Sequence, residues 1–235
     1  MPLRLARGAE KELFSVGGLL VLATVLAVTW PGWLIFLVVA LLAAAWGVLL
    51  WFFRHPRRAP EEEGDLFISP ADGQVVDVEL VHEPRFLHGP ATKIGIFMSL
   101  FDVHVNRAPM SGRVAFVQHV PGRFLQAFRP EAAEVNEHNL IGLETHHGRV
   151  LVKQISGILA RRIVCWVEPG QDLYTAEPLG VIKFGSRVEV YLPETTVPTV
   201  VLGERVYAGR TTIARPVANG DQDNDEDKIL VQGRA

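Results

Sequence analysis

A run of 40 residues without Asp, Glu, Lys or Arg, from Phe14 to Phe53, constrains this chain more than any other feature. As one straight helix it would extend about 60 Å, roughly twice the hydrocarbon thickness of a bilayer. Near its middle lies Trp30-Pro31-Gly32-Trp33, in which Pro-Gly breaks helices and tryptophan favours the membrane interface. The sequence therefore predicts an N-terminal transmembrane helical hairpin, with helices over residues 14–29 and 33–53. Because the first helix is short, a hairpin that only dips into the membrane stays open.

Basic residues flank the run on both sides: Arg4, Arg7 and Lys11 before it, and Arg54, Arg57 and Arg58 after it. Cytoplasmic flanks of membrane segments collect such residues, so residues 1–58 are predicted to anchor the chain in the cell membrane with both ends on the cytoplasmic side. The same charges would attract anionic headgroups, by about 1 kcal/mol per charge near the surface. A cleaved signal peptide is the alternative, but the run is far longer than a signal core and lacks an evident small-residue cleavage site.

The chain beyond Arg58 is long enough for one domain with its own core, predicted over residues 59–216. Its one cysteine, Cys165, lies in an apolar run, which excludes an intramolecular disulfide and a cysteine-based zinc motif. The formal net charge of −3 shows no bias toward nucleic acid, and no nucleic-acid partner is expected. Residues 217–235 contain the acidic stretch 221–227 and are predicted to form a disordered tail.

Short apolar runs separated by glycine and proline dominate the domain, whereas amphipathic patterns of helical length are scarce. Such runs are typical of strands. Strands are predicted over residues 73–78, 93–98, 149–153, 162–167 and 186–192. The fold class that follows is mainly β, an antiparallel sandwich or barrel. A Pro-x-x-Gly turn leads into a strand-like run twice, at residues 70–73 and 109–112, which suggests a partly duplicated sandwich.

The signatures of several enzyme classes are absent from the sequence: the glycine loops that bind nucleotides, the His-Glu-x-x-His zinc motif and the Gly-x-Ser-x-Gly nucleophile elbow. Polar residues inside apolar strands remain as candidates. Asp102, His104 and Asn106 alternate with valines, so a period of two predicts that they share one strand face. Three convergent polar groups indicate a functional site, although a single buried histidine more often has a structural role.

Five blocks of sequence resemble the short, archaeal-type branch of the phosphatidylserine decarboxylases. They follow in order from about residue 50 to about residue 193 and comprise residues 51–58, 68–75, 97–109, 154–164 and 183–187. Each block alone would be a weak signal, but five at plausible spacing are specific. A hydrophobic N-terminal anchor is also usual in that family, whereas the acidic tail lies outside the matching blocks.

The resemblance implies an enzyme whose cofactor is a covalent pyruvoyl group, made by self-cleavage between Gly185 and Ser186. In that chemistry the Ser186 hydroxyl attacks the Gly185 carbonyl, and the resulting ester undergoes β-elimination. The dehydroalanine left at position 186 hydrolyses to a pyruvoyl group with loss of ammonia, which leaves two chains, 1–185 and 186–235. A serine hydroxyl needs a base and an orienting partner. The family positions indicate His104 as the base and Asp72 as its partner.

The same resemblance implies decarboxylation of phosphatidylserine to phosphatidylethanolamine and carbon dioxide in phospholipid biosynthesis. The substrate amine would form a Schiff base with the pyruvoyl carbonyl at position 186, which accepts the electron pair released with carbon dioxide. Pyridoxal phosphate serves that purpose elsewhere, and neither it nor a metal is expected here. His104 could also protonate the carbanion. Which residue is the base in cleavage and which is the proton donor in turnover stays open.

Arg107, Asn106 and His138 are candidate substrate contacts. The longer branch of the family has a second histidine where this chain has Arg107, so one histidine would serve both maturation and turnover. The cut site reads Phe-Gly-Ser-Arg instead of Leu-Gly-Ser-Thr, and His138 stands where the short branch is expected to have arginine. Arg161 and Arg162 are either further phosphate ligands or solvent-facing charges at a strand edge.

Two other functions would explain part of the sequence. A membrane-anchored binding module would account for the hairpin and the β-domain, but not for Asp72, His104 and Gly185-Ser186 together. A pyridoxal-phosphate decarboxylase would use a lysine such as Lys153 or Lys183, yet the large α/β scaffold of such enzymes is lacking. The decarboxylase is favoured, with a phospholipid substrate and the membrane as partners, while a homo-oligomer stays open.

Overall fold

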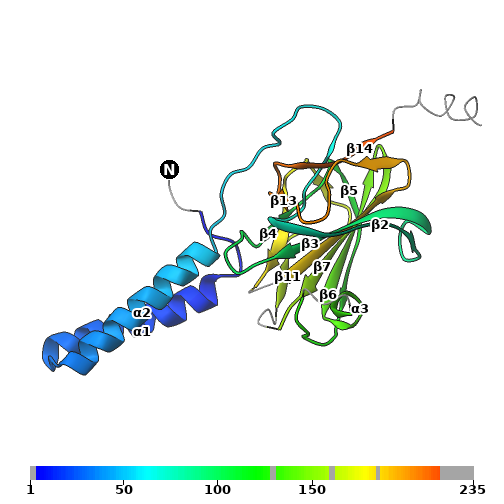
Figure 1. The fold of residues 1–235 in the computed structure, drawn as a ribbon. Helices are drawn as coiled ribbons and strands as arrows, with labels where there is room; N and C mark the ends of the chain where they lie inside the picture. The colour runs from blue at the N-terminus through cyan, green and yellow to red at the C-terminus, as the bar shows by residue number, and fades with distance from the viewer. Residues whose placement is uncertain (1–3, 128–130, 159–161, 184–185, 218–235) are drawn as a thin grey trace, which may run out of the picture.

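The computed structural model describes residues 4–127, 131–158, 162–183 and 186–217. Two helices project from one end of a β-domain that contains the rest of the described chain (Figure 1). Gly185, Arg161 and the expected acidic tail lie outside the described residues.

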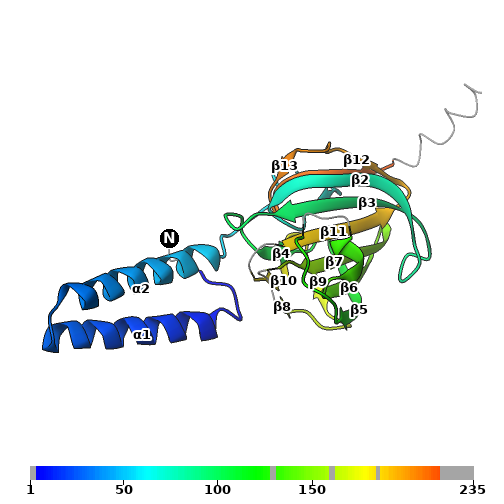
Figure 2. The same ribbon diagram turned by 60° about the horizontal axis from the view of Figure 1, so that its bottom comes forward.

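The hairpin consists of α1 (Glu10–Thr29) and α2 (Trp33–Phe52), which lie antiparallel and side by side (Figures 1 and 2). They pack closely, since a Cβ added to Gly17 would lie 3.2 Å from Nε1 of Trp46. Both helices are long and apolar enough to cross a membrane. The predicted hairpin is confirmed, and α1 begins four residues earlier than expected, so that each helix has 20 residues.

The described strands form one large and two small antiparallel sheets. The large sheet contains, in spatial order, β13 (Arg205–Val206), β2 (Gly73–Glu83), β3 (Gly89–Met98), β11 (Ser186–Pro193), β7 (Gly148–Ser156), β6 (His138–Thr145), β5 (Gly112–Val120) and β9 (Asp172–Leu173). One small sheet is β1 (Phe67–Ile68), β14 (Thr212–Pro216) and β12 (Thr196–Pro198). The other is β4 (Val105–Arg107), β10 (Pro178–Ile182) and β8 (Ile163–Cys165), and α3 (Ala132–Val135) is a single turn. The predicted mainly β fold is confirmed.

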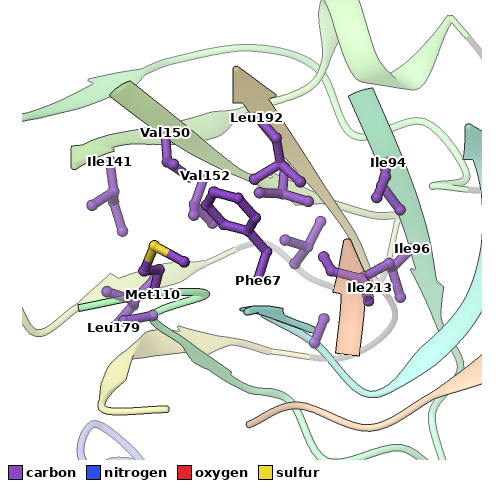
Figure 3. Close-up of a cluster of buried hydrophobic side chains, with 14 of the residues drawn as sticks. Phe67, Ile94, Ile96, Met110, Ile141, Val150, Val152, Leu179, Leu192 and Ile213 are labelled. Carbon is purple, nitrogen blue, oxygen red and sulfur yellow. The ribbon is translucent and has the colours of Figure 1, made fainter. Parts of the chain in front are cut away.

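The large sheet curls around a buried apolar core (Figures 2 and 3). The alternation of side chains along β11 shows how the sequence builds this core. Val188, Val190 and Leu192 point into the core, while the residues between them point away. Phe67 from β1 lies in the middle of these side chains in Figure 3. Each side chain of this size contributes about 1.5–3 kcal/mol when it leaves water, so the core stabilises the curl.

The two Pro-x-x-Gly turns do lead into strands, as predicted. Gly73 begins β2 with φ +159, and a Cβ there would lie 2.1 Å from the carbonyl oxygen of Phe97, so a side chain does not fit. Gly112 begins β5 in the same way. Both strands belong to the one large sheet, near its opposite edges, rather than to separate halves of a sandwich.

The base of the hairpin is packed onto the β-domain. Phe52 and Phe53 at the end of α2, with Ala6 and Ala9 before α1, bury their side chains against three valines of the domain, namely Val103, Val105 and Val181. On the same side, Nζ of Lys183 donates hydrogen bonds of 2.7 Å to the Gly8 carbonyl and to Glu12. The anchor and the start of β4 therefore form one packed unit.

Candidate active site

Ser186 is the first residue of β11 and is fully buried. The register places it beside Met98 of β3 and beside Ser156 of β7. Its side chain lies on the inner face of the sheet, the same face as Val188. The hydroxyl lies 3.3 Å from the sulfur of Met98, which is only a weak acceptor. The Ser186 hydroxyl is thus shielded from water without a strong hydrogen bond to that sulfur.

A row of buried amides extends from this point across the inner face. Asn106 places Nδ2 3.7 Å from the Met98 sulfur that Ser186 also contacts, and its Oδ1 accepts a 2.8 Å hydrogen bond from Gln154. Asn139 then donates to Oε1 of Gln154 at 3.1 Å. Gln154 and Asn139 were not singled out from the sequence. The signal was available, because each is a polar residue at an inward position of an otherwise apolar strand.

His104 lies immediately before β4, is buried, and has its Nδ1 3.0 Å from the carbonyl oxygen of Asp102. Because a carbonyl can only accept, Nδ1 carries the proton in the neutral ring and Nε2 keeps the lone pair. Burial lowers the pKa of His104 to about 4, so the ring is neutral at pH 7. The backbone carbonyl of His104 accepts a 3.3 Å hydrogen bond from Ile182, which places this residue beside the end of β10.

Asp72 is buried and has partners for both carboxylate oxygens. Oδ2 forms a 2.9 Å ion pair with Arg58, and Oδ1 accepts a 2.8 Å hydrogen bond from the Ala208 N–H. Nδ1 of His104 is oriented by a backbone carbonyl instead. The role of Asp72 as the partner of His104 stays a prediction.

The expectation that residues 102, 104 and 106 share one strand face is wrong. The strand begins only at Val105, and Asp102 lies in the loop before it. There its carboxylate accepts hydrogen bonds of 2.7 Å from both the N–H and the hydroxyl of Ser99 and pairs with Arg205. This local capping replaces the strand geometry, so Asp102 turns away from Asn106.

Arg107 is buried and ties the linker after α2 to the domain. Its guanidinium donates hydrogen bonds of 2.7 Å to the carbonyls of Pro56 and Ala176. Burial lowers the pKa of Arg107 to about 10, which leaves the group charged at neutral pH. Its use as a substrate contact stays a prediction, and two of its five N–H donors are already bound to backbone carbonyls.

His138 lies on the outer face of the large sheet, away from the Ser186 side chain. The register pairs it with Ile155, one residue before the Ser156 that stands beside Ser186. Burial lowers the pKa of His138, and the charges of Lys153 and Glu189 also act on it, as expected for groups on that face. The structure does not bring His138 to the Ser186 hydroxyl. Arg162 is exposed, and its carbonyl accepts a hydrogen bond from Lys183.

A cavity of about 660 Å³ lies between the linker after α2 and the loop that precedes β4. It is lined by the basic residues Arg4, Arg54, His55, Arg57, Arg58 and Arg205, by Asp72 and Asp102, and by Pro56, Phe101, Val103 and Tyr207. Arg54 is close enough to His104 for its charge to contribute to the lowered pKa of that ring. The cavity therefore adjoins the candidate base and is strongly positive.

One group of described side chains could hold a metal ion. Oδ2 of Asp65 contacts Nε2 of His146 and lies 2.7 Å from Nε2 of His147, and the three possible ligand atoms lie within 4.8 Å of one another. The histidines form the turn between β6 and β7. Ser156 ends the same β7 eight residues further on, about 26 Å away at the usual strand rise. This group is therefore remote from Ser186.

The chain is similar to known proteins over most of its length. A family model described as phosphatidylserine decarboxylase matches residues 47–214. A phosphatidylserine decarboxylase proenzyme of Carboxydothermus hydrogenoformans is 47% identical over 215 residues, which cover 91% of this chain and 97% of the relative. Proenzymes of the same name from Symbiobacterium thermophilum and Desulfotalea psychrophila are 47% and 42% identical, over 75% and 71% of this chain and 82% and 78% of those relatives.

Proposed function

The chain belongs to the phosphatidylserine decarboxylase family, and from this premise we propose that it converts phosphatidylserine to phosphatidylethanolamine and carbon dioxide with a pyruvoyl group formed from its own Ser186. Its relatives are proenzymes by name, which supports a maturation step. The observation that carries the proposal is the position of Ser186. It is a buried serine at the start of a central strand, at the end of the domain where His104 and the hairpin base also lie.

Maturation requires the Ser186 hydroxyl to lose its proton as its oxygen bonds to the Gly185 carbonyl carbon. The neutral His104 ring, with its lone pair on Nε2, is the proposed acceptor of that proton. The Gly185–Ser186 C–N bond then breaks to give an ester and a free amine. Elimination leaves a carboxylate on Gly185, and addition of one water molecule releases one ammonia and leaves the keto group at position 186.

The residues around Ser186 fit such a keto group. Within the described part of the chain, the partner that the Ser186 hydroxyl would give up is the Met98 sulfur, a weak acceptor. Asn106 contacts the same sulfur through Nδ2, so an amide donor and the Ser186 hydroxyl both lie beside Met98. A pyruvoyl group at position 186 would supply the carbonyl that takes up the electron pair released with carbon dioxide. Gln154 and Asn139 hold Asn106 in place beside this position through their hydrogen bonds.

The two apolar helices support a membrane anchor, and we place the β-domain on the cytoplasmic side because basic residues flank both ends of the hairpin. The substrate headgroup lies at the bilayer surface, so a domain packed onto the hairpin base needs to lift the lipid only slightly. This arrangement suits an enzyme that acts on a lipid without removing its acyl chains from the membrane.

The proposal is tested on purified full-length protein in detergent with vesicles of phosphatidylserine in phosphatidylcholine. Intact-mass measurement is expected to show fragments 1–185 and 186–235, the second with a pyruvoyl N-terminus, and the lipid assay is expected to show phosphatidylethanolamine. Cleaved protein that releases no carbon dioxide from phosphatidylserine would contradict the substrate. Active protein that stays as one chain would contradict the pyruvoyl group.

A further inference from the structure

With the hairpin across a bilayer as proposed, the arginine-lined cavity would lie at the height of the lipid headgroups. Each helix of the hairpin has 20 residues and so extends about 30 Å, which matches the hydrocarbon thickness of a bilayer. Residues just before α1 and just after α2 therefore come out at the level of the phosphates. The cavity is built from such residues on one side and from the β-domain on the other.

Most of its charged side chains are already engaged within the protein. Arg58 pairs with Asp72, and Arg205 pairs with Asp102. Arg54 donates hydrogen bonds to the carbonyls of Trp51 and Phe101, at 2.8 and 2.7 Å.

Arg4 and Arg57 are different. Both are exposed, both line the cavity, and neither guanidinium has a hydrogen-bond or ion-pair partner within the part of the chain that the structure describes. His55 lines the same cavity, and positive charges nearby act on its imidazole. Burial lowers its pKa to about 4, and the charges of Arg107 and Arg4 add to that effect. Two uncompensated guanidinium groups thus face one space at headgroup height.

We infer that Arg4 and Arg57 bind the phosphate of the phospholipid substrate in this cavity. The inference rests on the proposed function, which supplies a lipid with a phosphodiester and net negative charge. The planar guanidinium matches two phosphate oxygens at once, which makes arginine the usual choice for such a ligand. The predicted ligand Arg107 is less suited, because it does not line this cavity and each of its terminal nitrogens already donates one hydrogen bond, to Ala176 or to Pro56.

A phosphate site in this cavity also fits the expected positions of the serine headgroup and of the acyl chains. The cavity wall includes Asp102 and Val103, which directly precede His104, so a phosphate held there directs the serine end of the headgroup toward the candidate base. The acyl chains would leave along the hairpin, where an apolar groove of about 540 Å³ runs between the helices beside Leu13 and Trp46.

The first test is kinetic and uses dihexanoyl phosphatidylserine below its micelle concentration, which removes attraction to a membrane surface. Arg4→Gln/Arg57→Gln is expected to raise KM at least tenfold while kcat changes less than threefold. Lys11→Gln is the matched control, because Lys11 is an exposed basic residue at the start of α1 that lines neither this cavity nor the apolar groove; its KM should stay within twofold. An unchanged KM in the double variant overturns the inference, while wild-type turnover in the same assay separately tests the proposed function.

The second test does not depend on turnover. Uncleaved Ser186→Ala protein is titrated calorimetrically with dihexanoyl phosphatidic acid, which keeps the phosphate, and with dihexanoylglycerol, which lacks it. Only the phosphate-bearing lipid should bind, and adding Arg4→Gln/Arg57→Gln should weaken it at least tenfold. Equal weakening by Lys11→Gln would assign the effect to general attraction of anions and overturn the site.

Discussion

The imidazole of His104 packs against the ring of Phe52, with the two ring centroids 4.4 Å apart. One residue is the candidate base of the β-domain, and the other ends the second helix of the anchor. Phe52 thereby helps to bury His104, and burial is what lowers the pKa of that histidine to about 4. The hairpin, which we propose as the membrane anchor, is therefore also part of the environment of His104.

Removing Phe52 should change how maturation depends on pH. In the wild type His104 stays neutral down to about pH 4, so the cleavage rate is expected to be flat from pH 8 to about pH 5. Phe52→Ala exposes the ring and moves its pKa up toward 6.5, so protonation should remove the base and slow cleavage below about pH 6. The cleavage rate is measured on precursor made by cell-free synthesis. The precursor is transferred into buffers of different pH, and the uncut and cut chains are followed over time on a denaturing gel. A flat profile in Phe52→Ala would count against His104 as the base.

Replacing Ser186 should abolish both the cleavage into two chains and the formation of the pyruvoyl group. Ser186→Ala has no hydroxyl to attack Gly185, so a single uncut chain without decarboxylase activity is expected by intact mass and lipid assay. Its fold should persist, because among the described residues the hydroxyl contacts a weak acceptor, the Met98 sulfur. Ser111→Ala is the control, a serine bonded to Thr175 instead. Cleavage in Ser186→Ala would move the cut elsewhere.

Variants of Asp72 can show whether this residue has a structural role, a catalytic role or both. Asp72→Asn leaves Arg58 partly buried without its counter-charge, a loss of about 3 kcal/mol for a buried pair, and should lower the melting temperature. Cleavage should also slow at least tenfold if Asp72 is the partner of His104. Arg58→Gln/Asp72→Asn restores the charge balance and should recover melting temperature but not cleavage. Recovery of both would reduce Asp72 to a partner of Arg58 alone.

Shortening the anchor should have a different effect from removing it. Deleting residues 1–53 takes Phe52 and Phe53 away from Val103, Val105 and Val181, so misfolding or loss of cleavage is expected. Replacing residues 18–45 by a short Gly-Ser turn keeps this packed base. That variant should cleave normally and turn over dihexanoyl phosphatidylserine, but lose at least tenfold on vesicles. Equal activity on vesicles would show that the domain finds the membrane without the helices.

Chelation should leave the enzyme active. The group of metal-ligating type at Asp65, His146 and His147 lies at the opposite end of β7 from Ser156 and takes no part in the proposed chemistry. Turnover after dialysis against EDTA is therefore expected to stay within 20% or so of the untreated enzyme. A larger loss that zinc restores would show a dependence on metal, and Asp65→Ala would then locate it.

Much of the fold was predictable because its signals are local. The break at Pro31-Gly32 within an apolar run and the alternation of Val188 and Val190 specify a hairpin and strands without tertiary information. The strand face expected for Asp102 and His104 failed for an equally local reason. Ser99 and Asp102 form a capped loop, and a period-two pattern cannot distinguish that loop from the strand that follows.

The site was less predictable, because its parts are brought together by long-range pairing. The amide row of Asn106, Gln154 and Asn139 joins three strands, and only the register reveals it. The packing of Phe52 on His104 joins residues that sequence analysis had assigned to separate domains. Ser186 and His104 were identified through family resemblance, whereas Arg4 and Arg57 became candidates only when the cavity was known.

The place of Ser186 in the large sheet also determines whether the two chains stay together after the proposed cleavage. It is the first residue of a strand bonded on one side to β3 and on the other to β7, and the chain that follows also supplies β12, β13 and β14. A break just before Ser186 would cut the polypeptide but leave the folded domain in one piece. The fragment 186–235 would stay bound through the hydrogen bonds of β11 to β3 and β7, which both belong to the other fragment. The two chains should therefore separate only when the whole domain is denatured.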